Sequence, residues 1–295
     1  MTPFLCSVHT HATLCDGKAS PEEMAAAAYE AGVKYYGFSC HSHTPIPLDE
    51  GGVLPADMTA YRDTVFRLRE QYAGKMEILL GLEWDSCADV EPEGFDYWIG
   101  SVHYQRAPDG SYYTTDWDDE KFLCCLNEGC GGDVMTLIER YYEEAARVAA
   151  KKPTILGHFD GIVKLNAGNK YFDEDSSRYR ELALTALHSA DPAASLLEIN
   201  TGACSNTIAA LPIPPDSFWR NGEPWAVESS SRRTPMRQAA SCSAIRRPST
   251  LPRLRASHIP YCLPQTALSR ALSETQIRRF YKKDAASCRV FLHPH

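Results

Sequence analysis

Two histidines separated by one residue, His9 and His11, begin the part of the chain that could bind a metal ion. On an extended strand, side chains at positions i and i+2 project from the same face, so both imidazoles can reach one ion without distorting the backbone. Asp16 follows closely and can return from the next loop as an oxygen ligand. Neutral imidazole with carboxylate suits zinc, iron or manganese. A single His-x-His pair is weak evidence, so the interpretation depends on whether the pattern continues along the chain.

The pattern does continue, because histidine or glutamate recurs where short apolar segments end. The residues that follow such segments are His41, Glu83, His103 and His158, with Asn200 in the same place after a later segment. If the segments are parallel strands of a barrel, their carboxyl ends converge on one rim, where active sites lie. A single histidine at a strand end is more often structural than a ligand. Five successive strands that each bring His or Glu to one rim are hard to explain by packing, so the sequence predicts a metal site.

The elements that must position these residues alternate between strand and helix. Ser20, with Pro21 and Glu23 after it, has the composition of a helix start: a serine cap, a proline in the first turn and a glutamate that reaches back. We expect strands at 4–9, 34–40, 76–82, 95–102, 154–157 and 195–199, and helices at 22–31, 55–72, 133–151 and 178–188. Repeated βα units of this kind predict an α/β fold, either a parallel barrel or a doubly wound sheet.

Length and composition fit one large globular domain. The chain has 295 residues, of which 44% are hydrophobic, which is enough for a substantial core. It contains no apolar run of about 18 residues, so no membrane span is predicted. The N-terminus lacks the basic region and long apolar stretch of a signal peptide. The 11 cysteines are scattered irregularly, which favours reduced thiols, and we expect a cytoplasmic protein.

Five segments, taken in order, resemble the motifs of the PHP superfamily (polymerase and histidinol phosphatase). They are His9-Thr10-His11 with Asp16-Gly17, Gly37-Phe38-Ser39-Cys40-His41, Gly81-Leu82-Glu83, Ile99-Gly100-Ser101-Val102-His103 and Gly157-His158-Phe159-Asp160. The amino-acid sequences around Ser101-Val102-His103 and Glu198-Ile199-Asn200-Thr201 are similar to those of the histidinol-phosphatase branch. The resemblance covers about residues 4–210. It implies an α/β fold, a distorted, TIM-like (β/α)7 barrel, and leaves open whether the barrel is complete at the C-terminus.

The resemblance also implies a cofactor and a reaction. The cofactor is two or three divalent metal ions (Zn, Fe or Mn), on family ligand positions that correspond here to His9, His11, Asp16, His41, Glu83, His103 and His158. The implied reaction is hydrolysis of L-histidinol phosphate to L-histidinol and phosphate, in histidine biosynthesis. Clustered divalent ions can bind phosphate oxygens, generate hydroxide near neutral pH and stabilise the leaving alkoxide. A carboxylate can span two ions, so Glu83 is the expected bridge. Another PHP-type phosphoesterase, or an inactive metal-binding remnant, are the alternatives.

Further residues are expected to act on a small phosphorylated substrate, with no part for a membrane or nucleic acid. Lys164 and Lys170 follow the His158 strand and are candidate phosphate anchors, and Asn200 is a candidate substrate contact. Asp160 could orient His158 or bind a substrate amine, so that Glu83, His158 and Asp160 form the expected catalytic set. The family usually has Asp before the second-motif histidine, where this chain has Cys40. That exchange removes an acidic or hydrogen-bonding group beside the metal.

The C-terminal region differs from the rest in charge and pattern. Residues 216–295 contain 14 Lys and Arg against 5 Asp and Glu, whereas residues 1–215 contain 16 against 33. The βα pattern stops at the same place, and a mixture of Ser, Arg and Pro follows. An Asp-Ala-His triplet, the last metal motif of the family, should fall near residue 232 and is absent. We therefore divide the chain into a PHP barrel domain at 1–215 and a basic region at 216–295.

Three explanations compete for this basic region. It could bind nucleic acid or an acidic partner, it could be a divergent C-terminal subdomain, or it could be translated in a shifted frame. We favour the third explanation on codon grounds. Arg232-Arg233-Thr234, written CGA-CGC-ACA before a proline codon, reads one base later as GAC-GCA-CAC, which encodes Asp-Ala-His. A region read out of frame was not selected to pack, and the most useful observation is the DNA sequence from codon 205 to the stop.

Overall fold

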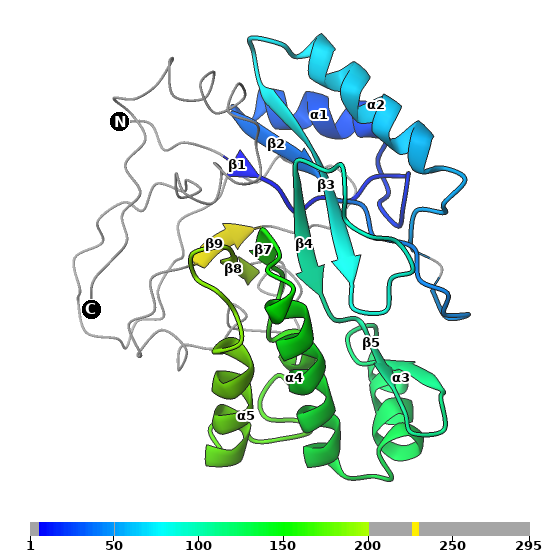
Figure 1. The fold of residues 1–295 in the computed structure, drawn as a ribbon, viewed down its shortest axis with the longest axis vertical. Coiled ribbons are helices and arrows are strands. Elements are labelled where there is room, and N and C mark those ends of the chain that lie inside the picture. The colour runs from blue at the N-terminus through cyan, green and yellow to red at the C-terminus, as the bar shows by residue number, and fades with distance from the viewer. Residues whose placement is uncertain (1–5, 50, 201–225, 230–295) are drawn as a thin grey trace, which may run out of the picture.

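A parallel seven-stranded sheet is the scaffold of the molecule (Figure 1). The computed structural model describes residues 6–49, 51–200 and 226–229, with backbone alone for 199–200 and 226–229. The strands, in their order across the sheet, are β1 (Cys6–Ser7), β2 (Tyr35–Phe38), β3 (Glu77–Asp85), β4 (Tyr97–Ser101), β7 (Ile155–Leu156), β8 (Leu196–Asn200) and β9 (Ala226–Ser229). Sequence order is kept across the sheet, as in a parallel barrel and unlike a doubly wound sheet, where the strand order reverses. The expected strands are confirmed with differences at their ends; of the first, expected at 4–9, residues 4–5 lie outside the described part of the chain and β1 is limited to Cys6–Ser7.

Four of the helices connect these strands, as the sequence predicts. They are α1 (Pro21–Glu30), α2 (Met58–Gln71), α4 (Val134–Ala150) and α5 (Ser177–Leu187). The predicted start of α1 is confirmed: the Ser20 hydroxyl accepts from the Glu23 amide, and the Glu23 carboxylate accepts from the Ser20 amide. Asp133 caps α4 and Ser176 caps α5 in the same way, through amides of the first turn. Local side-chain hydrogen bonds therefore fix the start of three of these helices, whereas α2 begins after Asp57 without a side-chain cap.

A small excursion after β4 was not predicted from the sequence. Strands β5 (Tyr104–Arg106) and β6 (Tyr112–Thr114) form an antiparallel hairpin, followed by α3 (Asp119–Cys124) and a five-residue π-helix, η1 (Cys125–Gly129). Three-residue strands and a six-residue helix leave too short a hydrophobic pattern to recognise in sequence. The excursion is held by packing, since Phe122 is fully buried and stacks on Tyr171 at a ring separation of 4.3 Å.

The sheet curls into a half-barrel, so that strands distant in order face each other. The His9 side chain, just after β1, reaches the Glu198 side chain on β8 at 2.6 Å. In the described ranges no backbone pairing joins β1 to β9. Two apolar clusters fill the structure, one between β2, β3 and α2, the other between the sheet, α4 and α5. Figure 1 shows α1 and α2 beside the first strands and α4 and α5 beside the last. No described helix is both long enough and apolar enough to cross a membrane.

Strand β9 lies beyond the boundary that we expected at residue 215. It pairs in parallel with β8 over four residue pairs, from Leu197–Ala226 to Asn200–Ser229. The sheet therefore takes up four residues of the region expected to lie outside the barrel. The rest of that region, 216–225 and 230–295, is outside the described residues. The same holds for the Arg232-Arg233-Thr234 triplet.

Candidate metal centre

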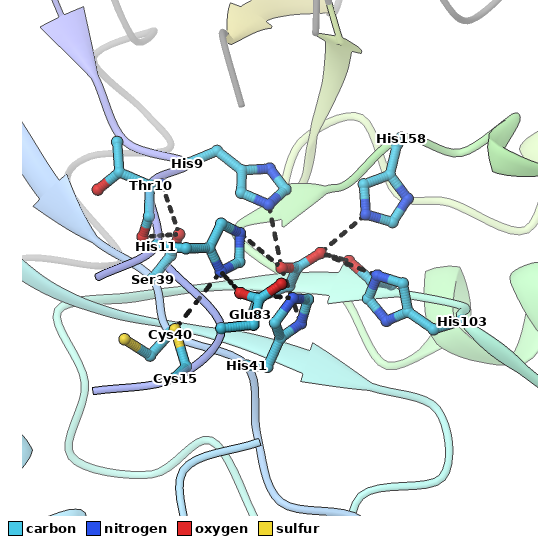
Figure 2. Close-up of polar contacts among 12 residues, drawn as sticks. His9, Thr10, His11, Cys15, Ser39, Cys40, His41, Glu83, His103 and His158 are labelled. Carbon is cyan, nitrogen blue, oxygen red and sulfur yellow. Dashed lines mark hydrogen bonds and ion pairs between the residues drawn. The ribbon is translucent and has the colours of Figure 1, made fainter. Parts of the chain in front are cut away.

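One buried carboxylate, that of Glu83, lies at the centre of the cluster (Figure 2). Glu83 is 1% exposed and sits near the carboxyl end of β3. Its Oε2 atom lies 3.1 Å from His9 Nε2, 3.2 Å from His11 Nε2 and 3.1 Å from His41 Nδ1. Three imidazole nitrogens thus converge on one oxygen. Within the described residues, none of them makes a hydrogen bond of acceptable geometry to that oxygen.

The other oxygen of Glu83 faces a second set of residues. Its Oε1 atom lies 2.8 Å from His158 Nε2 and 3.3 Å from His103 Nε2, and it accepts a 3.0 Å hydrogen bond from the Ser101 hydroxyl. The two oxygens are therefore divided between two groups of histidines. This arrangement fits a carboxylate that spans two ions.

Asp16 extends the cluster on the side away from Glu83. Its Oδ1 atom lies 3.5 Å from His11 Nδ1 and 3.7 Å from His41 Nε2. Ligand-capable atoms of His11, Asp16 and His41 lie within 4.8 Å of one another, as do those of His9, His11 and Glu83, and those of His41, Glu83 and His103. The structure thus brings all seven predicted metal ligands into one cluster.

The cluster forms because five strand ends meet at one edge of the sheet. His41 follows β2 and forms an isolated parallel bridge with Glu83, which holds the two neighbouring strand ends in register. His103 follows β4, and His158 follows the two-residue strand β7. These short connections leave the side chains little freedom to point elsewhere, so the site is positioned by the backbone of the sheet.

Two glycines of the motifs make room for a tyrosine that crosses beneath the site. A Cβ atom at Gly37 or at Gly81 would lie 2.2 Å from atoms of the Tyr97 side chain, too close for any other residue. The Tyr97 hydroxyl donates a hydrogen bond of 2.5 Å to the Val8 carbonyl, immediately before His9. The glycines thereby allow β4 to hold the strand end that carries the first ligand pair.

Two further carboxylates orient the histidines, and sequence reasoning did not identify them. Glu198 Oε1 lies 2.6 Å from His9 Nδ1, and its Oε2 accepts a 2.6 Å hydrogen bond from the His158 backbone amide. Asp85 Oδ2 lies 3.1 Å from His103 Nδ1 and accepts a 2.9 Å bond from the His103 amide. Metal-ligating histidines usually donate their second ring N–H to such a carboxylate. The available signal was an acidic residue inside a buried apolar strand, which is costly unless it is paired.

The electrostatics of the cluster fit divalent cations. If His9 donates its Nδ1 proton to Glu198, the Nε2 lone pair of its neutral ring points at Glu83. The His103 ring lies in the same way between two carboxylates, those of Asp85 and Glu83. Burial acts to lower the pKa of His9 and of His103, but the surrounding carboxylates outweigh it and raise both pKa values well above the usual value. These positions therefore favour a positive charge between imidazole and carboxylate. A divalent ion supplies that charge without a proton, so the residues present fit a metal cluster.

Comparison with known proteins gives the family of the chain. The model of the PHP domain matches residues 6–202. The chain belongs to the PHP domain family. It is also 28% identical over 181 residues to the histidinol-phosphatase of Bacillus subtilis, an alignment that covers 56% of this chain. The chain spans 65% of the length of that relative.

Two solved structures share the PHP fold. The putative histidinol phosphatase of Listeria monocytogenes superposes with a TM-score of 0.63 at 18% identity, over 76% of this chain and 94% of the other. The histidinol phosphate phosphatase of Lactococcus lactis, solved with Zn, L-histidinol and phosphate, gives a TM-score of 0.53 at 17% identity, over 78% and 85% of the two chains. At these identities the likeness shows the fold alone, and it confirms the PHP-type architecture that the sequence predicts.

The structure places Asp160 away from the expected catalytic position. Asp160 is fully buried, and its Oδ1 atom accepts hydrogen bonds from the hydroxyls of Tyr142 and Tyr179, the latter at 2.6 Å. Burial raises the pKa of Asp160 to about 7, against the effect of the two hydroxyls. Asp160 faces the interior between α4 and α5, and no hydrogen bond within the described residues joins it to the His158 ring. Its proximity to His158 in sequence was misleading, because the chain turns into the short 3-10 helix η2 (Gly161–Val163) at this point.

The candidate substrate-binding residues occupy different surroundings. Lys164 lies 3.3 Å from Asp116 Oδ2, and Asp116 is close enough to His103 and His158 for their charges to affect its pKa. Lys170 instead pairs with Asp119 at the start of α3, at 2.6 Å, and none of its described contacts is with the histidines. Asn200 ends β8, and its side chain is outside the described part of the chain. Lys164 is therefore the candidate that the structure brings to the cluster.

Replacing Glu198 with glutamine should weaken metal binding while the fold is kept. Glutamine has the same shape, but it cannot accept on both sides as the carboxylate does, so it loses the contact to His9 or to the His158 amide. Loss of such an orienting partner typically costs about 10- to 100-fold in metal affinity. Zinc titration with a competing chromophoric chelator measures the change. Glu181→Gln, on the exposed face of α5, is the control, and equal zinc affinity in both variants would contradict the role of Glu198.

Proposed function

We propose that this PHP domain is a metal-dependent phosphomonoesterase that hydrolyses L-histidinol phosphate to L-histidinol and phosphate, as a step of histidine biosynthesis. The observation that carries the proposal is the set of five imidazoles around one buried carboxylate, Glu83. The match of the chain to the histidinol-phosphatase of Bacillus subtilis supports the substrate. The structure from Lactococcus lactis that contains Zn, L-histidinol and phosphate supports both the ion and the substrate class.

The seven ligand candidates would hold two or three divalent ions of Zn, Fe or Mn, and Glu83 belongs to two of the three groups of neighbouring ligand atoms. Bound ions of this kind supply Lewis acidity for phosphate oxygens and lower the pKa of a bound water. The residues of the chain perform the remaining tasks. Glu83 keeps the two histidine groups at a fixed separation through its two oxygens, and Glu198 and Asp85 fix the tautomers of His9 and His103. The ligand atoms are thereby preorganised before substrate binds.

Lys164 is suited to bind the phosphate of the substrate next to the ions. Its ammonium group pairs with Asp116, which the Thr114 hydroxyl also contacts at 3.0 Å. Burial opposes ionisation of Asp116, yet Lys164 and the imidazoles of His103 and His158 keep the pKa of Asp116 below its usual range. The charged pair fixes the position of the lysine at the edge of the cluster. Asn200 and Lys170 stay candidates for further substrate contacts.

A panel of phosphomonoesters tests the proposed substrate. The zinc-reconstituted chain is assayed for phosphate release from L-histidinol phosphate, sugar phosphates, nucleoside monophosphates and a 3′-phosphorylated oligonucleotide. The proposal requires the highest kcat/KM for L-histidinol phosphate. A higher value for another member would assign a different PHP-type phosphoesterase activity, and activity retained after exhaustive chelation would exclude the metal-dependent mechanism.

Lys164→Gln should raise the KM for L-histidinol phosphate about tenfold or more, since it removes a charged hydrogen bond worth roughly 1.5–3 kcal/mol. Lys152→Gln is the control, because Lys152 pairs with Asp191 and is not a candidate for substrate binding. Steady-state kinetics of both variants measure the difference. Equal KM values for the two variants would show that Lys164 does not bind the phosphate group.

An inactive metal-binding remnant is a second candidate, favoured by the missing Asp-Ala-His triplet. One Asp and one His ligand of the family are then lacking, although the seven described ligand candidates are in place. We propose that residues 1–215, extended by β9, form the PHP domain and that the basic region after it is read in a shifted frame. Zinc content separates the candidates: a remnant should keep fewer ions per chain than a version whose nucleotide sequence restores the triplet, and only the restored version should release phosphate.

A further inference from the structure

Two thiols that have no part in the proposed reaction lie together beside the metal centre. Cys15 directly precedes Asp16 in the loop after β1, and Cys40 directly precedes His41 after β2. The two thiols are close enough to affect each other's pKa, and Figure 2 shows their sulfur atoms near one another. Two cysteines that are distant in sequence thus meet between two of the candidate metal ligands.

The surroundings give the two thiols different access to solvent. Cys40 is 0% exposed and belongs to the apolar cluster around β2 and α2. Cys15 is partly exposed, and its Sγ atom donates to the Ala12 carbonyl at 3.4 Å and lies 3.7 Å from His11 Nδ1. A small oxidant therefore reaches Cys15 first. Cys40, held against it and shielded from solvent, is placed to react with the oxidised sulfur.

We infer that Cys15 and Cys40 are a redox modification site, in which a peroxide converts the two thiols into a disulfide. Hydrogen peroxide oxidises the Cys15 thiol to a sulfenic acid and releases one water. The Cys40 sulfur then attacks the Cys15 sulfur, the S–O bond breaks, and a second water leaves as the S–S bond forms. The two thiols lose two electrons in all, and the peroxide gains them. The inference concerns the thiols themselves and does not depend on the proposed substrate.

The disulfide would act on the metal centre through its neighbours. It joins the loop that carries Asp16 to the segment that carries His41, and it removes the contact of the Cys15 thiol with His11. Disulfide geometry is narrow, so the bond draws both backbones towards a fixed separation. The three ligand atoms of the His11–Asp16–His41 group then move from their present spacing. Oxidation is therefore expected to lower zinc retention at this group.

Another thiol pair in the described ranges provides an internal comparison. Cys125 and Cys130 are in contact at the two ends of η1, and Cys130 lies 3.6 Å from Arg140 Nη1 on α4. Neither residue contacts a ligand candidate. Oxidation of this pair should leave zinc retention unchanged, so a variant that keeps it and lacks the Cys15–Cys40 pair isolates the effect.

Peptide mapping tests the bond. The full chain is treated with hydrogen peroxide, its remaining thiols are alkylated, and it is digested with trypsin. If the disulfide forms, the digest contains fragments 1–18 and 35–62 joined to each other. Reduction should restore both thiols and separate the two fragments. Fragment 1–18 also holds Cys6, so Cys6→Ser should keep the cross-link, whereas Cys15→Ser and Cys40→Ser should each remove it. A cross-link that persists in Cys15→Ser, or its absence from the oxidised wild type, overturns the inference.

Zinc retention tests the consequence. After peroxide treatment and gel filtration, the wild type should lose at least one zinc ion per chain and recover it on reduction with dithiothreitol in the presence of zinc. Cys40→Ser, checked for folding by its melting curve, should retain zinc through the same treatment. Two results would overturn the coupling to the metal centre: equal zinc loss in Cys40→Ser and wild type, or full retention in a wild type whose cross-link is proven.

Discussion

Glu83→Gln is expected to abolish zinc binding at the cluster and, with it, phosphatase activity. The substitution keeps the shape but removes the charge around which five imidazole nitrogens lie at 2.8–3.3 Å. An amide cannot span two ions, so both histidine groups lose their shared ligand. Removing a residue that is hydrogen-bonded to a metal ligand typically lowers metal affinity or activity by roughly 10- to 100-fold. We expect the loss of both quantities in Glu83→Gln to be larger. Zinc per chain after gel filtration, and kcat on L-histidinol phosphate, measure it.

Glu77→Gln is the matched control for this experiment. Glu77 begins the same strand, β3, but is exposed at the opposite end from the cluster. This variant should keep zinc and activity at the level of the wild type. A Glu83→Gln chain that folds and still holds the full complement of zinc would show that the cluster is not the metal centre.

The second large effect is a zinc-induced gain in thermal stability that grows with pH. In the metal-free chain, burial acts to lower the pKa of His9, His103 and His11, but neighbouring groups raise all three, that of His11 to about 9. Stability from these protonated imidazoles is fully present below the unfolded value near 6.5 and is lost as pH rises through the raised pKa values. The metal-free chain should therefore lose stability between about pH 6.5 and 9.

Zinc binding depends on pH in the opposite direction. The imidazoles must be neutral to bind the ion, so each proton that zinc displaces adds about 1.4 kcal/mol of binding free energy per pH unit. His41 does not add to this competition, since burial lowers its pKa to about 3. Zinc at 100 times its Kd stabilises the fold by about 2.7 kcal/mol. Melting curves with and without zinc at pH 6, 7 and 8 should show a widening gap, and a gap that narrows with rising pH would contradict the assignment.

The sequence alone predicted the ligand candidates and the order of the elements. Histidine and glutamate after short apolar segments predicted the cluster, because carboxyl ends of parallel strands meet at one edge. The capping pattern at Ser20 predicted the start of α1, because its hydrogen bonds are local to one helical turn. Both rest on interactions between residues close in sequence or on the fixed geometry of a strand. The missing Asp-Ala-His triplet was likewise visible in sequence alone.

Only the tertiary structure decided which side chains support the ligands. Glu198 contacts His9, which is 189 positions away in the chain, and Cys15 lies near Cys40 from a different loop. No local sequence pattern predicts either contact. Asp160 is adjacent to a ligand in sequence but turns into the core to meet two tyrosines. Nothing in the sequence favoured Lys164 over Lys170 as a phosphate anchor. In the structure, Lys164 pairs with Asp116 and Lys170 pairs with Asp119. Such partners are set by how the sheet curls and where its helices pack, which is a property of the whole fold and not of any one segment.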